Sequence, residues 1–220
     1  MISRHDYYQR MQVLAQEKRL EYAIETASLN LRSISKIYKQ EGIKIDLWDT
    51  RGSKIRAAYF CDGDDYSVLL NKKLPREPKL FSLVHELKHH FEDRKSIQNG
   101  QIQCGDYNSN EVIEIGAEVF AAEFIYPESE TRSLAAKLGI TISTCSAERV
   151  VEFKRACPAI VSYKFIVKRF ERLGFCLSGQ FRQEQFQKLE EALYGVPIYK
   201  QSWFRRHRDR KSQANKSKKE

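Results

Sequence analysis

The segment from Phe81 to His90 contains an H-E-x-x-H motif, His85-Glu86-Leu87-Lys88-His89, within an apolar stretch. Residues four apart lie on one face of an α-helix, so the imidazoles of His85 and His89 can hold one metal ion between them. Glu86 follows the first histidine and is close enough to reach a water on that metal without binding the metal itself. The pattern therefore predicts a helix that carries two metal ligands and a base, as zinc peptidases do.

The motif has an alternative interpretation, because it also arises by chance. The chain has 5 histidines and 20 glutamates among 220 residues, so composition alone produces the pattern in about 1% of such chains. In that case the helix is an ordinary one whose histidines are satisfied by other contacts. A third ligand elsewhere would favour the metal site, because catalytic zinc usually has three protein ligands and a water.

A second predicted helix, from Ser109 or Asn110 to the residue before Pro127, carries candidates for this third ligand. The spacing of three and four residues puts carboxylates and small residues on one stripe of it, namely Glu114, Ala117, Glu118, Ala121 and Ile125. Alanines let a neighbouring backbone come close, which a carboxylate needs if it is to reach a metal held by another helix.

We assign Glu114 as the third metal ligand, which predicts one zinc ion per chain. Glu118, one turn later on the same face, is placed to accept the free ring N–H of a ligating histidine and so to fix its tautomer. Three other residues remain rival ligands: Glu111, Glu118 itself and His90.

The two segments together resemble the ImmA/IrrE family of cytoplasmic metallopeptidases. The resemblance rests on the H-E-x-x-H motif followed by Glu114-Ile-Gly-Ala-Glu-Val-Phe-Ala-Ala-Glu-Phe-Ile-Tyr-Pro127, and it covers roughly residues 30–176. Three positions depart from the family pattern: Lys88 stands where glycine is frequent, Tyr126 where methionine is frequent, and Glu118 where asparagine or aspartate is frequent. The resemblance implies a cytoplasmic zinc metallo-endopeptidase that cleaves a helix-turn-helix transcriptional repressor of a mobile element or a stress response.

In the predicted reaction, Glu86 takes a proton from the water that attacks the peptide carbonyl and then returns it to the leaving amine. Zinc would stabilise the oxyanion, together with one further donor. Tyr66, Tyr107 and Tyr126 are the candidates for this donor.

The order of the predicted elements indicates an α+β fold with a zincin-like peptidase core. Two N-terminal helices are predicted, the second of which ends near Gly42. Three strands follow at 43–48, 55–61 and 66–71, and the motif helix then runs from Lys79 to about Glu92. These elements predict a short twisted three-stranded sheet beside the H-E-x-x-H helix and the helix that bears Glu114. We expect the strand at 66–71 to be the sheet edge that pairs with an extended substrate.

Residues 128–199 are predicted to form a C-terminal helical subdomain, with helices at 129–138, 146–156, 162–173 and 180–194. The second and third of these have the length of a helix-turn-helix, and the third is basic through Lys164, Lys168, Arg169 and Arg172. We therefore divide the chain into N-terminal helices and peptidase core (1–127), helical subdomain (128–199) and tail (200–220).

The net charge of +9 is concentrated in the tail. Residues 200–220 hold 9 Lys and Arg against 2 Asp and Glu, whereas residues 1–199 hold 29 against 27. This composition predicts a disordered tail that either keeps the protein soluble or makes weak contact with nucleic acid.

The chain shows neither a signal peptide nor an apolar run of 18 residues, so we expect no membrane partner. Its 5 cysteines are scattered and odd in number. This pattern suits a reducing cytoplasm, and it argues against both a disulfide framework and a cysteine-ligated zinc site.

The rival hypothesis is a DNA- or partner-binding regulator on a peptidase-like scaffold, in which the metal is structural or absent. The basic helix and the basic tail favour this hypothesis. Glu86 argues against it, because a purely structural metal site needs ligands but no base.

Overall fold

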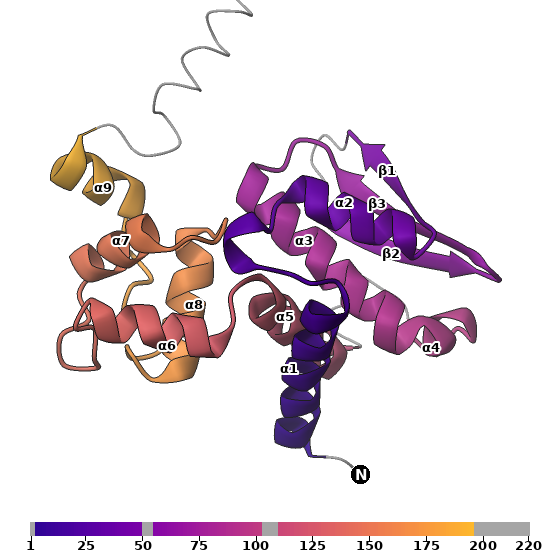
Figure 1. The fold of residues 1–220 in the computed structure, drawn as a ribbon, viewed down its shortest axis with the longest axis horizontal. Helices are drawn as coiled ribbons and strands as arrows, with labels where there is room; N and C mark the ends of the chain where they lie inside the picture. The colour runs from indigo at the N-terminus through magenta and orange to yellow at the C-terminus, as the bar shows by residue number, and fades with distance from the viewer. Residues whose placement is uncertain (1–2, 50–54, 103–109, 196–220) are drawn as a thin grey trace, which may run out of the picture. The chain divides into compact units, whose positions relative to one another are not determined.

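The computed structural model of the protein describes residues 3–49, 55–102 and 110–195. The chain divides into two compact units, Met1–Ser133 with Cys157–Phe165 and Leu134–Ala156 with Ile166–Glu220, and we describe each by itself. Helices and a small sheet are both present, so the predicted α+β class is confirmed (Figure 1). Among the described residues, no helix combines the length and the apolarity needed to cross a bilayer.

The sheet of the first unit has three strands, β1 (Ile43–Trp48), β2 (Ala57–Asp62) and β3 (Asp65–Asn71). Their order is β1-β3-β2, with β1 parallel and β2 antiparallel to β3 (Figure 1). The predicted strands therefore exist, each within two residues of its predicted ends. A tight turn at Gly63, whose φ is +54°, joins β2 to β3, a conformation that glycine adopts without steric cost.

The central place of β3 corrects one prediction. Because β3 is paired on both sides, it has no free edge for a substrate, and the expectation that the strand at 66–71 forms the edge is wrong. Strand order depends on pairing between distant segments, whereas the sequence shows only the order along the chain.

One face of the sheet is covered by α2 (Leu31–Gln40) and α3 (Arg76–Lys88). Apolar side chains from the sheet and from both helices are buried there, among them Val68 of β3, Ile34 and Ile37 of α2, and Leu80 and Leu87 of α3. The Tyr38 hydroxyl of α2 also donates to the backbone oxygen of Leu83 at 2.7 Å. This core fixes α3, the helix that carries the H-E-x-x-H motif.

The motif helix differs from its prediction at both ends. It begins at Arg76 instead of Lys79, since Pro78 lies in the first turn, where a helix does not need the missing N–H. After Lys88 the chain makes one π-helical turn, η2 (His89–Asp93), and then a short helix, α4 (Arg94–Gln98). π-turns inside helices are rare and occur frequently at functional sites.

Helix α5 (Glu111–Ile125) bears Glu114, and α1 (Arg4–Glu21) packs along it (Figure 1). The contact is close because Gly116 faces the ring of Tyr7; a Cβ on Gly116 would lie 2.5 Å from Tyr7 Cε1. Polar contacts extend the pairing, for example from Gln16 Nε2 to Glu123 Oε1 at 3.0 Å. A 3₁₀ turn, η1 (Thr26–Ser28), connects α1 to α2.

Within residues 110–195, the helices that follow are α6 (Glu128–Lys137), α7 (Ala147–Ala156), α8 (Tyr163–Leu173) and α9 (Phe186–Tyr194). In the second unit, Phe153 of α7 and Phe170 of α8 pack edge to face with ring centroids 4.8 Å apart.

The last helix is shorter than predicted, because residues 177–184 form turns instead of helix. Gln180 contributes to this difference: its side chain accepts from the Leu177 N–H and donates to the Cys145 backbone oxygen. The predicted tail at 200–220 lies outside the described residues.

Candidate metal centre

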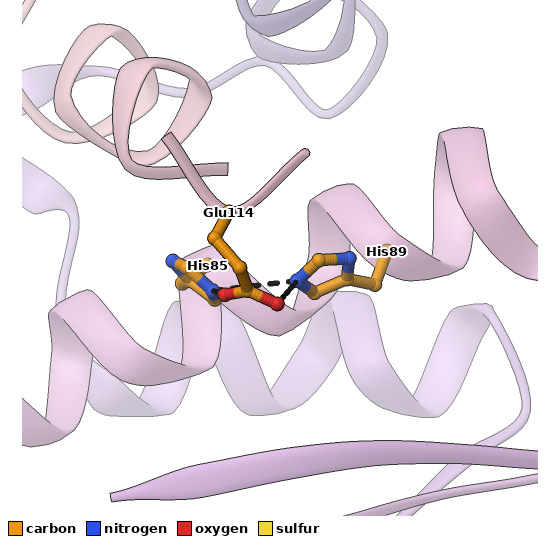
Figure 2. A group of neighbouring side chains, drawn as sticks. All are labelled: His85, His89 and Glu114. Atoms are coloured by element: carbon orange, nitrogen blue, oxygen red, sulfur yellow. Dashed lines mark hydrogen bonds and ion pairs between the residues drawn. The ribbon is translucent and has the colours of Figure 1, made fainter. Parts of the chain in front are cut away.

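The H-E-x-x-H motif spans the junction of α3 and the π-turn. His85 and Glu86 lie in α3, whereas His89 is the first residue of η2. Helix α5 crosses close by and presents Glu114 towards the two histidines (Figure 2). The buried apolar residues of α3 hold this helix on the sheet, so the position of the motif follows from the core.

The three side chains converge on one point. His85 Nε2 lies 3.1 Å from Glu114 Oε2 and 3.3 Å from His89 Nε2, and His89 Nε2 lies 3.7 Å from Glu114 Oε1. One ligand atom from each residue thus falls within 4.8 Å of the others, a grouping that could hold a metal ion (Figure 2). The His89 side chain is 1% exposed and that of His85 is 15% exposed, so the group opens to solvent on the His85 side.

The chemistry of these atoms suits a divalent metal. Two imidazole nitrogens and a carboxylate oxygen are the donors that zinc takes in catalytic sites. The Nδ1 atom of His89 lies 2.7 Å from Asp93 Oδ2, so the ring proton belongs on Nδ1 and the lone pair of Nε2 faces the group. The residues present therefore fit a metal held by three protein atoms.

Asp93 was not among the predicted site residues. It lies at the end of the π-turn, four residues after His89, and its Oδ2 atom accepts from both His89 and Lys88. Burial by itself would raise the pKa of Asp93, but the hydrogen bond from His89 and the charge of Lys88 outweigh it and lower this pKa. The sequence did hold a signal for Asp93: it is an acidic residue four positions after the second histidine of the motif, at the predicted end of the helix.

Glu86 lies on the sheet side of the motif and is 5% exposed. Burial raises the pKa of its carboxyl, against the opposing charges of His85 and His89 and a hydrogen bond with the backbone of Tyr59 in β2. A carboxylate whose pKa is raised is a stronger base, which suits the uptake of a proton from water.

Glu114 and its three rivals all lie in the described part of the chain, and of these four only Glu114 joins the group with the two histidines. Glu111 is exposed and lies 3.9 Å from Arg4. His90 faces the other way, with Nδ1 at 2.9 Å from the Tyr59 hydroxyl and Nε2 at 3.3 Å from Glu41. The assignment of Glu114 as ligand stays a prediction that this geometry favours.

Glu118 is half-buried on α5, one turn after Glu114. Burial lowers the pKa of His85, but its hydrogen bond with Glu114 and the charges of Glu86, Glu114 and Glu118 raise it overall. Asp93 already accepts the Nδ1 proton of His89. The histidine whose ring N–H Glu118 is predicted to accept is therefore His85, and this role stays a prediction.

The first unit has a small sheet, two crossed helices and a candidate His–His–Glu metal site beside a buried glutamate, and these features define a zincin-like peptidase core. The family model for the IrrE N-terminal-like domain, Peptidase_M78, matches residues 39–169, more than half of the chain. The chain therefore belongs to this peptidase family, as its resemblance to ImmA/IrrE proteins predicted. No curated protein matches the sequence.

Proposed function

We propose that the protein is a zinc-dependent endopeptidase whose ligands are His85, His89 and Glu114 and whose base is Glu86. Membership of a metallopeptidase family supports the peptidase reaction. The observation that carries the proposal is the convergence of the two Nε2 atoms with the Glu114 carboxylate, with Glu86 buried on the same helix. Nitrogen and carboxylate donors in this number are the ones that zinc prefers.

Each residue has a distinct task in the proposed reaction. Zinc held by the three ligands would polarise the peptide carbonyl and make water more acidic. Glu86 accepts the proton of the attacking water and passes it to the leaving amine; its raised pKa favours the first of these steps, the uptake of the proton. Asp93 keeps the proton of His89 on Nδ1, and Glu118 supports His85.

Three tyrosines are candidates for the donor that completes the oxyanion site. The Tyr126 hydroxyl donates to the backbone oxygen of Glu130 at 3.2 Å, so this hydroxyl already has an acceptor. The ring of Tyr66 packs edge-on against His90, with centroids 5.0 Å apart. Tyr107 lies outside the described residues.

For the substrate, we propose an extended segment of a helix-turn-helix repressor. Only the resemblance to ImmA/IrrE proteins supports this choice. Glu86 is hydrogen-bonded to the backbone of Tyr59 in β2, so β2 is the strand beside the base. Because β2 is also an edge strand, we propose that the substrate pairs along its outer edge and not along β3. The proposed site of action is the cytoplasm, which suits the four described cysteines because they form no disulfide.

The test is co-expression of the protein with the repressor encoded by a neighbouring gene. Wild-type protein should cleave it, and Glu86→Gln should bind zinc but leave it intact, because an amide cannot take up the proton. Glu77→Gln changes the same residue type in the first turn of the same helix and should cleave as wild type does. Full cleavage by Glu86→Gln would disprove the role of Glu86.

One observation favours the rival function, a DNA-binding regulator. Lys164, Lys168 and Arg172 lie four residues apart along α8 and are exposed, so they form a basic stripe. Arg169, which the sequence also assigned to the basic face, is only 3% exposed and lies in the core. Three charges on one helix are a small footprint for DNA binding, and we therefore rank this function second.

A further inference from the structure

Lys88, in the middle of the motif, is completely buried. Lysine is almost never fully buried unless its charge is paired. The burial is unexpected from the sequence, since this position departs from the glycine that is frequent in the family and lies beside a ligand candidate. A buried charge at this place needs a specific reason.

The ammonium of Lys88 contacts both chain segments that carry the proposed metal ligands, the one with His89 and the one with Glu114. Nζ donates to Asp93 Oδ2 at 2.6 Å, and the same oxygen lies 2.7 Å from Nδ1 of His89. Nζ also donates to the backbone oxygen of Ile113 at 3.4 Å, the residue directly before Glu114. One cation thus joins the carboxylate behind one histidine to the helix that carries the third ligand.

The π-turn makes this arrangement possible. Lys88 and Asp93 are five residues apart, and in an α-helix such residues do not face each other, because neighbours on the surface are three or four apart. The i→i+5 bonding of η2 changes this spacing. The ion pair and the π-turn therefore stabilise each other.

Helix α1 adds a further contact to Lys88. The Tyr7 ring centroid lies 5.5 Å from Nζ, a distance at which an aromatic face attracts a cation. Gly116 of α5 permits Tyr7 to come this close. The family model begins only at residue 39, so the sequence match leaves α1 out while the structure places it against the centre.

We infer that Lys88 is a positioning residue of the metal centre, which holds Asp93 against His89 and ties it to the backbone beside Glu114. The inference rests on the proposed metal site. Without Lys88, the Asp93 carboxylate would be buried with no cation beside it, which is strongly disfavoured, and it would leave its position. His89 would then lose the acceptor that orients its ring.

A competing effect has the opposite sign, because the Lys88 ammonium also repels a divalent cation. The Asp93 carboxylate contacts both the ammonium and the His89 ring, and its negative charge opposes this repulsion. We therefore expect the orienting effect to dominate and the metal to bind more weakly when Lys88 is replaced.

The experiment measures the Zn²⁺ affinity of metal-free, full-length protein by competition with a chromophoric chelator. Lys88→Met, which keeps the length and removes the charge, should weaken binding by about tenfold or more, as should Asp93→Asn. The double variant should bind no more weakly than Asp93→Asn does, because Lys88 acts through Asp93 and the lone ammonium left in Asp93→Asn only repels the metal. Lys44→Met removes an exposed ion pair with Asp65 on the sheet and should bind as wild type does.

Unchanged or tighter binding by Lys88→Met would overturn the inference, whereas failure of wild-type protein to bind Zn²⁺ would instead disprove the proposed metal site. If Lys88→Met does not fold, the double variant buries no unpaired charge and its comparison with Asp93→Asn decides. A double variant that binds Zn²⁺ at least as tightly as Asp93→Asn supports the inference, and one that binds it still more weakly contradicts it. Absorption of bound Co²⁺ should also shift in Lys88→Met, which a purely structural role would not cause.

Discussion

The contact between α1 and α5 beside the metal centre predicts an unusual response to Gly116→Ala. In a helix interior, alanine is more favourable than glycine by about 1 kcal/mol. Here the new Cβ would lie 2.5 Å from Cε1 and 3.0 Å from the hydroxyl oxygen of Tyr7, and overpacking of this kind costs about 1–3 kcal/mol. The net expectation is a destabilisation of about 1 kcal/mol, instead of the usual gain.

The effect of Gly116→Ala on the free energy of unfolding should change sign when Tyr7 is replaced by alanine. In the Tyr7→Ala background the clash is absent, so Gly116→Ala should stabilise the protein by about 1 kcal/mol, the helix preference alone. The difference between the two backgrounds measures the contact, in the manner of a double-mutant cycle.

Thermal unfolding of the metal-free proteins is the assay, because bound metal would stabilise the folded state through mass action. A change of 1 kcal/mol corresponds to about 2–4 °C in a protein of this size, so the two backgrounds should shift the melting temperature in opposite directions. An equal stabilisation by Gly116→Ala in both backgrounds would refute the close approach of α1 to α5.

Three other predictions concern the site and the tail. Elemental analysis should find about one zinc per chain, lost in His85→Ala and Glu114→Ala but retained in Glu118→Ala; the reverse result for the two glutamates would invert their roles. Since burial raises the pKa of Glu86 in the metal-free protein, its charged form opposes folding, so Glu86→Gln should melt higher than wild type at pH 7, and the difference should vanish as the pH falls below the pKa of an unfolded glutamate. A chain ending after Phe204 should bind zinc and cleave as the full chain does, and any DNA binding that it loses should be steeply salt-dependent in the full chain.

Local periodicity was enough to predict the ligand group that the structure brings together. His85 and His89 are four apart in a helical segment, and Glu114 lies on a stripe of small residues, so their faces follow from helix geometry alone. The three strands and most of the helices were equally visible, because their hydrophobic patterns are local.

Features that depend on contacts between distant segments could not be predicted. The central position of β3 follows from its parallel pairing with β1, which the chain order 1-2-3 does not reveal. Arg169 occupies a core position although its neighbours in sequence suggested an exposed basic face. In both cases the tertiary structure decided which face or edge is exposed.

The sequence by itself determined the chemistry of the centre, because residue types and helical spacing are properties of the chain. Only the tertiary structure decided what supports it. The π-turn that aligns Lys88 with Asp93, and the approach of Tyr7 to Gly116, require packing between α1, α3 and α5. A buried lysine is stable only where such packing supplies its partners, and no local pattern records where those partners will be.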